Sequence, residues 1–105
     1  MELKKITAII RSTKLEEVED HLHRANIKGI SVSTVKGYGE NKNFFGHDWK
    51  VTHARIEIFT RASEVDRIAK IIMESASTGS SGDGVIAVLP VENIWKIRTK
   101  SKWAN

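Results

Sequence analysis

The glycine-rich stretch at residues 78–84 is the first part of the chain whose residue types suit ligand binding. It reads Thr-Gly-Ser-Ser-Gly-Asp-Gly, with three glycines in seven residues. Glycines permit positive φ angles and, lacking side chains, let backbone N–H groups converge on an anion or a purine edge. Turn chemistry is the simpler explanation of the stretch alone, with Gly79 ending a helix and Asp83-Gly84 turning into a strand. Its role therefore depends on its surroundings.

Groups that could carry out catalysis are sparse. Ser80, Ser81 and Asp83 are close in sequence, but no histidine stands near them to act as a general base. A serine without a placed base is more often part of a turn than a nucleophile. We therefore predict that the protein is not an enzyme.

The histidines form weak metal-binding patterns. His21 and His23 are two residues apart on a predicted helix and point in different directions. His47 and His53 flank a long loop and could meet, but no third ligand stands near them. We predict no metal site, and a divalent-metal-binding protein remains an alternative.

A short aromatic motif imitates an RNA-binding signature. Residues 36–39, Lys-Gly-Tyr-Gly, match its first half, but Glu40, Asn41 and Lys42 do not match its second half. The predicted first strand offers no aromatic residue on which a base could stack. We expect no nucleic-acid partner, and a small RNA-binding module remains an alternative.

Composition indicates one soluble domain over residues 1–105. The 105 residues are 40% hydrophobic, enough for one core, and contain no cysteine. No signal peptide or membrane span is evident, so we expect a cytoplasmic protein. The net charge of +4 favours anionic partners. Positive charge gathers only in the basic segment 94–105, and such a cluster is more often a solvated end than a site.

Hydrophobic periodicity gives the elements that must position these residues. Alternation predicts strands over residues 3–11, 30–35, 51–60 and 85–89, with a further extended segment over 94–99. The first strand is apolar on both faces, which predicts a central strand. The fourth is continuously apolar, which predicts burial on both faces, and Pro90 is expected to end it.

Two amphipathic helices alternate with the strands. The three-and-four spacing places them over residues 14–25 and about 63–76. Thr13 with Glu16, and Ser63 with Asp66, predict a capping box at each start. Residues 37–51 show no hydrophobic periodicity, which predicts a long exposed loop.

The order of elements predicts an α+β, ferredoxin-like split β-α-β fold (βαββαβ) with a short extra C-terminal strand. Two helices cover only one face of a four-stranded sheet, although several strands are apolar on both faces. We therefore expect a homo-oligomer, with ligand sites in clefts between subunits.

With these elements placed, the chain resembles the PII signal-transduction (nitrogen regulatory) family along almost its whole length. The matching stretches are IIR at 9–11, KL at 14–15, GISV at 29–32, VKGYG at 35–39, RIEI at 55–58, TG at 78–79, GDG at 82–84, PVE at 90–92 and KIRT at 96–99. Their number and order make the resemblance specific.

The resemblance implies a homotrimer that binds adenine nucleotides between subunits and engages a target protein through the loop at 37–51. Residues 78–84 would form the phosphate loop, and two basic residues would reach the phosphates from the adjoining subunit. The implied nucleotide-binding residues are Ile9, Ser31, Gly37, Tyr38, Gly39, Thr78, Gly82, Asp83, Gly84, Lys96 and Arg98.

Departures from the family pattern modify this expectation. The loop is shorter than the family's usual one and lacks its modifiable tyrosine, so we do not expect uridylylation. Glu40 stands where the family has an arginine, Asn41 where it has a glutamine that helps hold magnesium and 2-oxoglutarate, and His53 where it has a lysine that contacts the same ligands. We therefore do not expect 2-oxoglutarate sensing. Ser80 and Val85 each replace a lysine, and losing even one charged phosphate contact shifts preference from ATP toward ADP or AMP by about tenfold.

The departures resemble PII-like branches linked to inorganic carbon, bicarbonate transport or metal efflux. We therefore expect a regulator of a transporter or metabolic enzyme, with bicarbonate as a second candidate ligand. A small-anion site would use Gly39, Asn41, His53 and Arg55.

Overall fold

The computed structural model describes residues 2–36 and 52–103. Its main elements are β1 (Leu3–Arg11), α1 (Leu15–Arg24), β2 (Ile30–Val35), β3 (His53–Arg61), α3 (Val65–Ala76), β4 (Gly84–Val91), β5 (Trp95–Lys96) and β6 (Ser101–Lys102). The predicted loop at 37–51, with Gly37, Tyr38, Gly39, Glu40, Asn41 and His47, lies outside the described residues.

Strands β1 to β4 form one antiparallel sheet in the order β2-β3-β1-β4. Ile6 of β1 lies opposite Ile58 of β3 and Val88 of β4, while Ile30 of β2 lies opposite Ile58. This order confirms the ferredoxin-like βαββαβ fold and the central position of the first strand.

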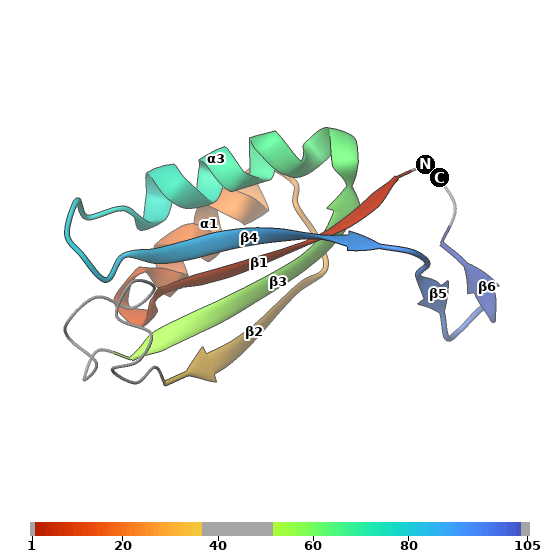
Figure 1. Ribbon diagram of the computed structural model, residues 1–105, viewed down its shortest axis with the longest axis horizontal. Coiled ribbons are helices and arrows are strands. Elements are labelled where there is room, and N and C mark those ends of the chain that lie inside the picture. The colour runs from red at the N-terminus through yellow and green to blue at the C-terminus, as the bar shows by residue number, and fades with distance from the viewer. Residues whose placement is uncertain (1, 37–51, 104–105) are drawn as a thin grey trace.

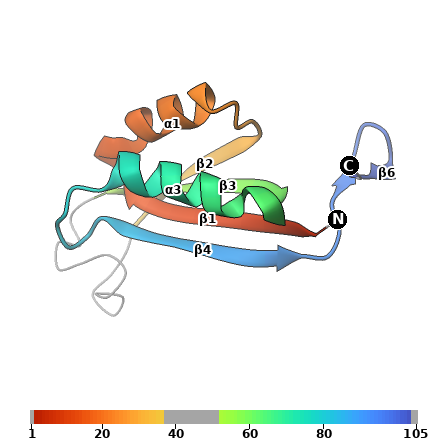
Figure 2. The same cartoon turned by 90° about the horizontal axis from the view of Figure 1, so that it is seen from above.

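Both helices cover the same face of the sheet (Figures 1 and 2). Ile6, Ala8 and Ile10 occupy alternate positions along β1, and their side chains point toward the helices. All three are almost fully buried. Val18 and Leu22 of α1 are buried from the other side, one turn apart. The core includes Ile6, Ala8, Ile10, Val18, Leu22, Ala54, Ile56, Ile58, Ile68, Ile72 and Ala76.

The other face of the sheet has no covering layer among the described elements (Figure 2). It carries a mixture of charged and apolar side chains, because the positions that alternate with the core point this way. Lys5 forms an ion pair with Glu57 across β1 and β3. Phe59 is 50% exposed and Leu89 is 43% exposed. The open face therefore combines exposed apolar side chains with charged ones of both signs, and exposed apolar groups of this kind suit association with other chains.

The two helices begin differently from the prediction. Each follows a 3₁₀ turn, Ser12–Lys14 or Ala62–Glu64, and neither N-cap residue, Lys14 or Glu64, makes a side-chain capping bond. The predicted capping boxes are therefore wrong. Thr13 and Ser63 lie inside the 3₁₀ turns, where the tighter backbone already supplies acceptors for N–H groups.

Strand β4 also departs from the prediction. It is an edge strand, so the expectation that it is buried on both faces is wrong, and its residues are half-buried or exposed. Pro90 does not end the strand but lies within it, opposite Lys4. An edge strand has no neighbour on one side, so the missing N–H of a proline there removes no ladder bond.

The C-terminal part forms a separate hairpin instead of one short extra strand. β5 and β6 pair in their own two-stranded sheet, with Trp95 opposite Lys102 and Lys96 opposite Ser101. Lys100 has a φ of 57° in the connecting turn, and its N–H donates to the Lys96 carbonyl at 2.9 Å. The hairpin projects beyond the end of the main sheet (Figures 1 and 2).

Candidate functional site: a carboxylate-filled glycine loop

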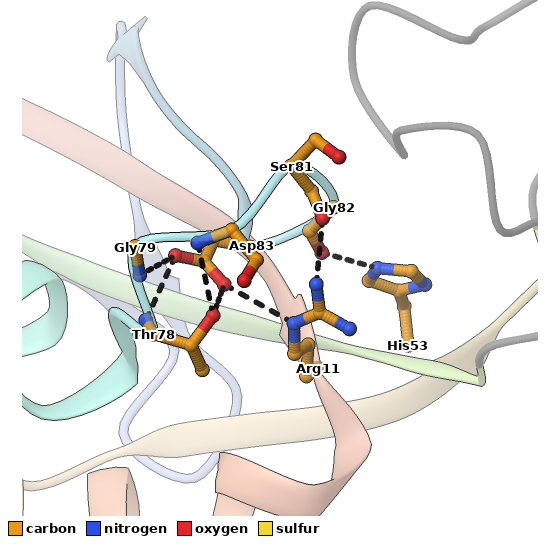
Figure 3. A network of polar contacts seen from close by, with 8 residues as sticks. Arg11, His53, Thr78, Gly79, Ser81, Gly82 and Asp83 are labelled. Carbon is orange, nitrogen blue, oxygen red and sulfur yellow. Dashed lines mark hydrogen bonds and ion pairs between the residues drawn. The ribbon is translucent and has the colours of Figure 1, made fainter.

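The glycine loop, residues 77–83 between α3 and β4, is built around the carboxylate of Asp83 (Figure 3). Asp83 Oδ2 accepts hydrogen bonds from the backbone N–H of Thr78 at 2.8 Å and of Gly79 at 3.0 Å. Asp83 Oδ1 accepts from the Thr78 hydroxyl and from Arg11 Nε at 3.1 Å. The backbone amides in the first half of the loop therefore already bind an anion, which belongs to the chain itself.

Side chains from the ends of two neighbouring strands, β1 and β3, contact the loop. Arg11, the last residue of β1, donates from Nη2 to the Ser81 carbonyl at 2.6 Å. His53, the first residue of β3, lies 3.0 Å from the Gly82 carbonyl through Nε2. Because a carbonyl oxygen only accepts, Nε2 carries the proton in this contact. Residues 81, 82 and 83 are thus each tied to a side chain of the sheet.

The polar contacts decide the charge of Asp83. Burial by itself raises the pKa of this carboxyl group. The hydrogen bonds from Thr78, Arg11 and Gly79 outweigh burial and hold the pKa well below its ordinary value. Asp83 therefore stays ionised at neutral pH, and the adjacent Arg11 guanidinium balances its charge.

Gly84 is a glycine for a packing reason. A Cβ built on it would lie 1.7 Å from the Ile9 carbonyl oxygen, and its φ is +108°. The backbone that leaves the loop therefore lies directly against β1, and no other residue fits without moving one of the strands. This close approach sets the position of the whole loop relative to Arg11.

A cleft of about 630 Å³ opens beside the loop, between α3 and the edge strand β4. Its size is in the range of small-molecule sites. Its walls are mainly apolar, including Ile9, Val85 and Met73. The described residues that line it include the acids Glu74 and Asp83 but no lysine or arginine. A phosphate bound here needs cations from another source.

The predicted residues of the glycine loop and of β1 come together at this end of the sheet. Ile9 pairs with Val85, directly beyond Gly84, and lines the cleft together with Asp83 and Gly84. Thr78 and Gly82 lie in the loop itself. These five predicted residues therefore lie together at one end of the sheet.

Other predicted residues lie apart from the loop. Ser31 is on the edge strand β2 and pairs with Glu57, about 10 Å or two strand spacings away from β1. Arg55 points to β2 as well, where Nε donates to the Ser33 hydroxyl at 3.2 Å. Of the two predicted small-anion residues that the structure describes, His53 contacts the glycine loop and Arg55 contacts β2. Gly39 and Asn41 lie outside the described residues.

Lys96 and Arg98 lie at the opposite end of the molecule, in the hairpin (Figure 1). β4 alone has eight residues and separates them from the loop by roughly 26 Å. Both residues are exposed. Within one chain they cannot reach an anion held at the glycine loop.

Arg11 was not among the predicted site residues, although it contacts the loop at two points. Its partner Asp83 is 72 residues away in the sequence. The only signal available was the position of an arginine at the end of a strand that pairs with the strand after the loop. That signal requires the register of β1 and β4, which residue patterns do not supply.

The described part of the chain holds no group of three or more histidine, cysteine or acidic residues arranged to bind a metal ion. Among the same residues, none of the helices has the length and apolar character needed to cross a membrane.

Fold and site together define a small α+β domain with a ligand-sized cleft beside its glycine loop. The family profile described as Nitrogen regulatory protein P-II matches residues 3–101. The chain belongs to this family. PII proteins are signal-transduction regulators that respond to small-molecule effectors, so membership confirms the prediction of a regulator that is not an enzyme.

Individual relatives agree over almost the full length. Nitrogen regulatory protein P-II of Azospirillum brasilense is 41% identical, over 95% of this chain and 96% of its own. The protein of the same name from Synechocystis is 37% identical with the same coverage. Among solved structures, Arabidopsis thaliana PII bound to citrate superimposes with a TM-score of 0.83 at 32% identity, covering 97% of this chain and 89% of that one.

Proposed function

We propose that this chain is a homotrimeric PII-type regulator that binds an adenine nucleotide between subunits. The glycine loop and Ile9 of one subunit would hold the nucleotide. Lys96 and Arg98 of the neighbouring hairpin would neutralise its phosphates. Residues 37–51 would carry the signal to a transporter or metabolic enzyme in the cytoplasm.

One observation carries the proposal: the glycine loop and the basic residues of the hairpin lie at opposite ends of the same chain. The cleft at the loop end is lined by Glu74 and Asp83, while the hairpin end carries Lys96 and Arg98. A head-to-tail ring brings one end of each subunit to the other end of the next, and such a ring closes at a small number of copies. The exposed Phe59 and Leu89 of the open face support burial between subunits.

The flanks of the proposed effector loop also fit this arrangement. Lys36 follows β2 and Thr52 precedes β3, both at the end of the sheet that carries the glycine loop. Ser12 donates to the Thr52 carbonyl through both N–H at 3.0 Å and Oγ at 2.9 Å. Nucleotide binding beside Arg11 and Ser12 therefore has a short path to the start of β3.

Subunit mixing tests the shared site. A hairpin variant, Lys96→Ala with Arg98→Ala, and a loop variant, Gly82→Val, which is strained at a φ of 93°, should each lose ADP binding in calorimetry. After the two are unfolded and refolded together in equal amounts, random assembly into rings restores about one site in four. Light scattering should give a trimer mass. No restored binding, or a monomer mass, would refute the shared site.

We propose further that ADP or AMP is preferred over ATP. Val85 faces the open side of β4 beside Ile9 and supplies no charge where the family pattern has a lysine. Val85→Lys should therefore raise the affinity for ATP relative to AMP by about tenfold, because a charged contact to phosphate is gained. Val88→Lys, on the same strand but facing the helices, is the matched control.

The pathway proposal is inorganic-carbon or metal handling, with bicarbonate as second ligand. His53 already contacts the Gly82 carbonyl, so an anion near His53 would act on the glycine loop. Calorimetric titration of ADP should give a different affinity with and without bicarbonate. An identical binding curve with the same heat ends the bicarbonate proposal and leaves nucleotide binding untouched.

A further inference from the structure

Asp83 places a negative charge inside the loop that is proposed to hold phosphate. Its carboxylate occupies the N–H groups of Thr78 and Gly79, and the N–H of Ser80 donates to the Thr78 hydroxyl at 3.2 Å. The backbone N–H groups that remain for an incoming phosphate are those of the second half of the loop, after Ser80. There the phosphate meets the field of Asp83, which is repulsive unless a cation balances it.

Arg11 is that cation. Its Nε lies 3.1 Å from Asp83 Oδ1, and the two side chains are only 19% and 24% exposed, so water screens the pair incompletely. Its Nη2 contact to the Ser81 carbonyl spans the part of the loop that Asp83 does not hold. Arg11 therefore has two effects: it balances the charge of Asp83 and fixes the bend between residues 81 and 83 (Figure 3).

The same contacts direct Arg11 toward the protein. Arg11 Nε and Nη2 both donate to atoms of the loop. The Asp83 carboxylate lies between the guanidinium and the amides of Thr78 and Gly79. We propose that Arg11 is a positioning residue of the nucleotide site, which acts through Asp83 and the Ser81 carbonyl without touching the phosphate. This inference rests on the proposed function.

Binding measurements with the intact chain separate this role from others. Arg11→Gln should weaken ADP about tenfold but adenosine less than about threefold, because only the phosphates meet the unbalanced carboxylate. Adding Asp83→Asn should restore most of the ADP affinity, because the repelling charge is removed. Arg24→Gln removes the same charge from an exposed ion pair with Asp20 on α1 and should change neither affinity.

The double variant decides between mechanisms. A direct phosphate contact predicts that Arg11→Gln with Asp83→Asn binds ADP no better than Arg11→Gln alone. A purely structural role predicts equal losses for ADP and adenosine. Either result would overturn the proposal.

A measurement without nucleotide keeps this test independent of the proposed function. Amide hydrogen exchange followed by NMR should be about tenfold faster at Thr78 and Gly79 in Arg11→Gln, because Asp83 holds these N–H groups less firmly. The control Arg24→Gln should leave both rates unchanged. If the unaltered protein binds no adenosine phosphate, the proposed function fails, and unchanged exchange at these two amides separately refutes the role of Arg11.

Discussion

The two ends of the sheet differ in how completely their polar groups are used. At the loop end, Arg11 and Thr78 both donate hydrogen bonds to Asp83, and Arg11 is only 19% exposed. At the hairpin end, Ile97 is 94% exposed and Trp95 is 60% exposed, with Lys102 placed 5.2 Å from the Trp95 ring. The loop end is therefore closed by its own polar contacts, whereas the hairpin end leaves large side chains exposed, as the proposed contact with a neighbouring subunit requires.

The clefts at the two ends differ in the charged residues that line them. The cleft at the loop end has acidic residues in its wall. A smaller cleft of about 290 Å³ is lined by Trp103, which follows the hairpin, and by residues of the main domain. Its charged lining residues are Lys28, Arg61, Glu64 and Arg67. The two clefts therefore differ in their charged residues, although Arg11 balances Asp83 beside the first cleft.

The largest effect is expected where the backbone of the loop end meets β1. Gly84→Ala puts a Cβ 1.7 Å from the Ile9 carbonyl, so β4 must separate from β1, at a cost of about 3 kcal/mol or more. Gly79→Ala is the matched control, because it has a similar positive φ of +85° but nothing within 4 Å of the new Cβ. Urea unfolding should show the second variant losing only about 1–2 kcal/mol. Equal losses would mean that the close approach is unimportant.

At the hairpin end, a charge change should alter binding but not folding. Arg98→Ala should weaken ADP binding by tenfold or more, because a charged phosphate contact is lost, and should leave the melting temperature of the free protein almost unchanged. His21→Ala, in which an exposed side chain on α1 is removed, serves as control. Calorimetry that gives equal affinities for the two variants would contradict the hairpin assignment.

Acid should weaken the loop end selectively. The pKa of Asp83 is lower in the folded chain than in the unfolded chain, where it is about 3.9. Its stabilisation is therefore fully present above that value and is lost as the pH falls toward the folded-state pKa. Asp83→Asn should cost about 1–3 kcal/mol in unfolding free energy near neutral pH and clearly less at about pH 3.

The comparison of unfolding free energies at the two pH values has its own control. Asp20→Asn alters an exposed ion pair with Arg24 and should change the unfolding free energy by under about 0.5 kcal/mol at either pH. All variants are compared at one protein concentration, since assembly adds to apparent stability. A cost of Asp83→Asn that does not change with pH would contradict the charged state assigned to Asp83.

The smallest effect is expected at the strand pair of the hairpin that lies farthest from its turn. Lys102→Gln removes the cation–π contact with Trp95, and exposed contacts of this kind contribute about 0.5–1 kcal/mol at most. Thermal unfolding should therefore shift little. A large loss of stability would show that the hairpin belongs to the fold of the single chain, and the contrast between the two ends would have to be withdrawn.

Much of the fold was predictable because its signals are local. Alternation along Leu3–Arg11 and Ile30–Val35 identified both strands, and helical spacing identified Leu15–Arg24 and Val65–Ala76. The glycine loop was also placed correctly, between α3 and β4. Errors arose where one signal had two explanations: Pro90 fits a strand end as well as an edge strand, and Thr13 fits a capping box as well as a 3₁₀ turn.

Residue order alone determined which segments are strands, helices and turns, since side-chain alternation and glycine content act over a few neighbouring residues. Tertiary structure decided which of them meet. Only the pairing of β1 with β4 brings Arg11 to Asp83, 72 residues later, and so fills the loop amides with a carboxylate of the chain itself. The same pairing sets Lys96 and Arg98 at the far end of β4, because an extended strand cannot return its end to its beginning.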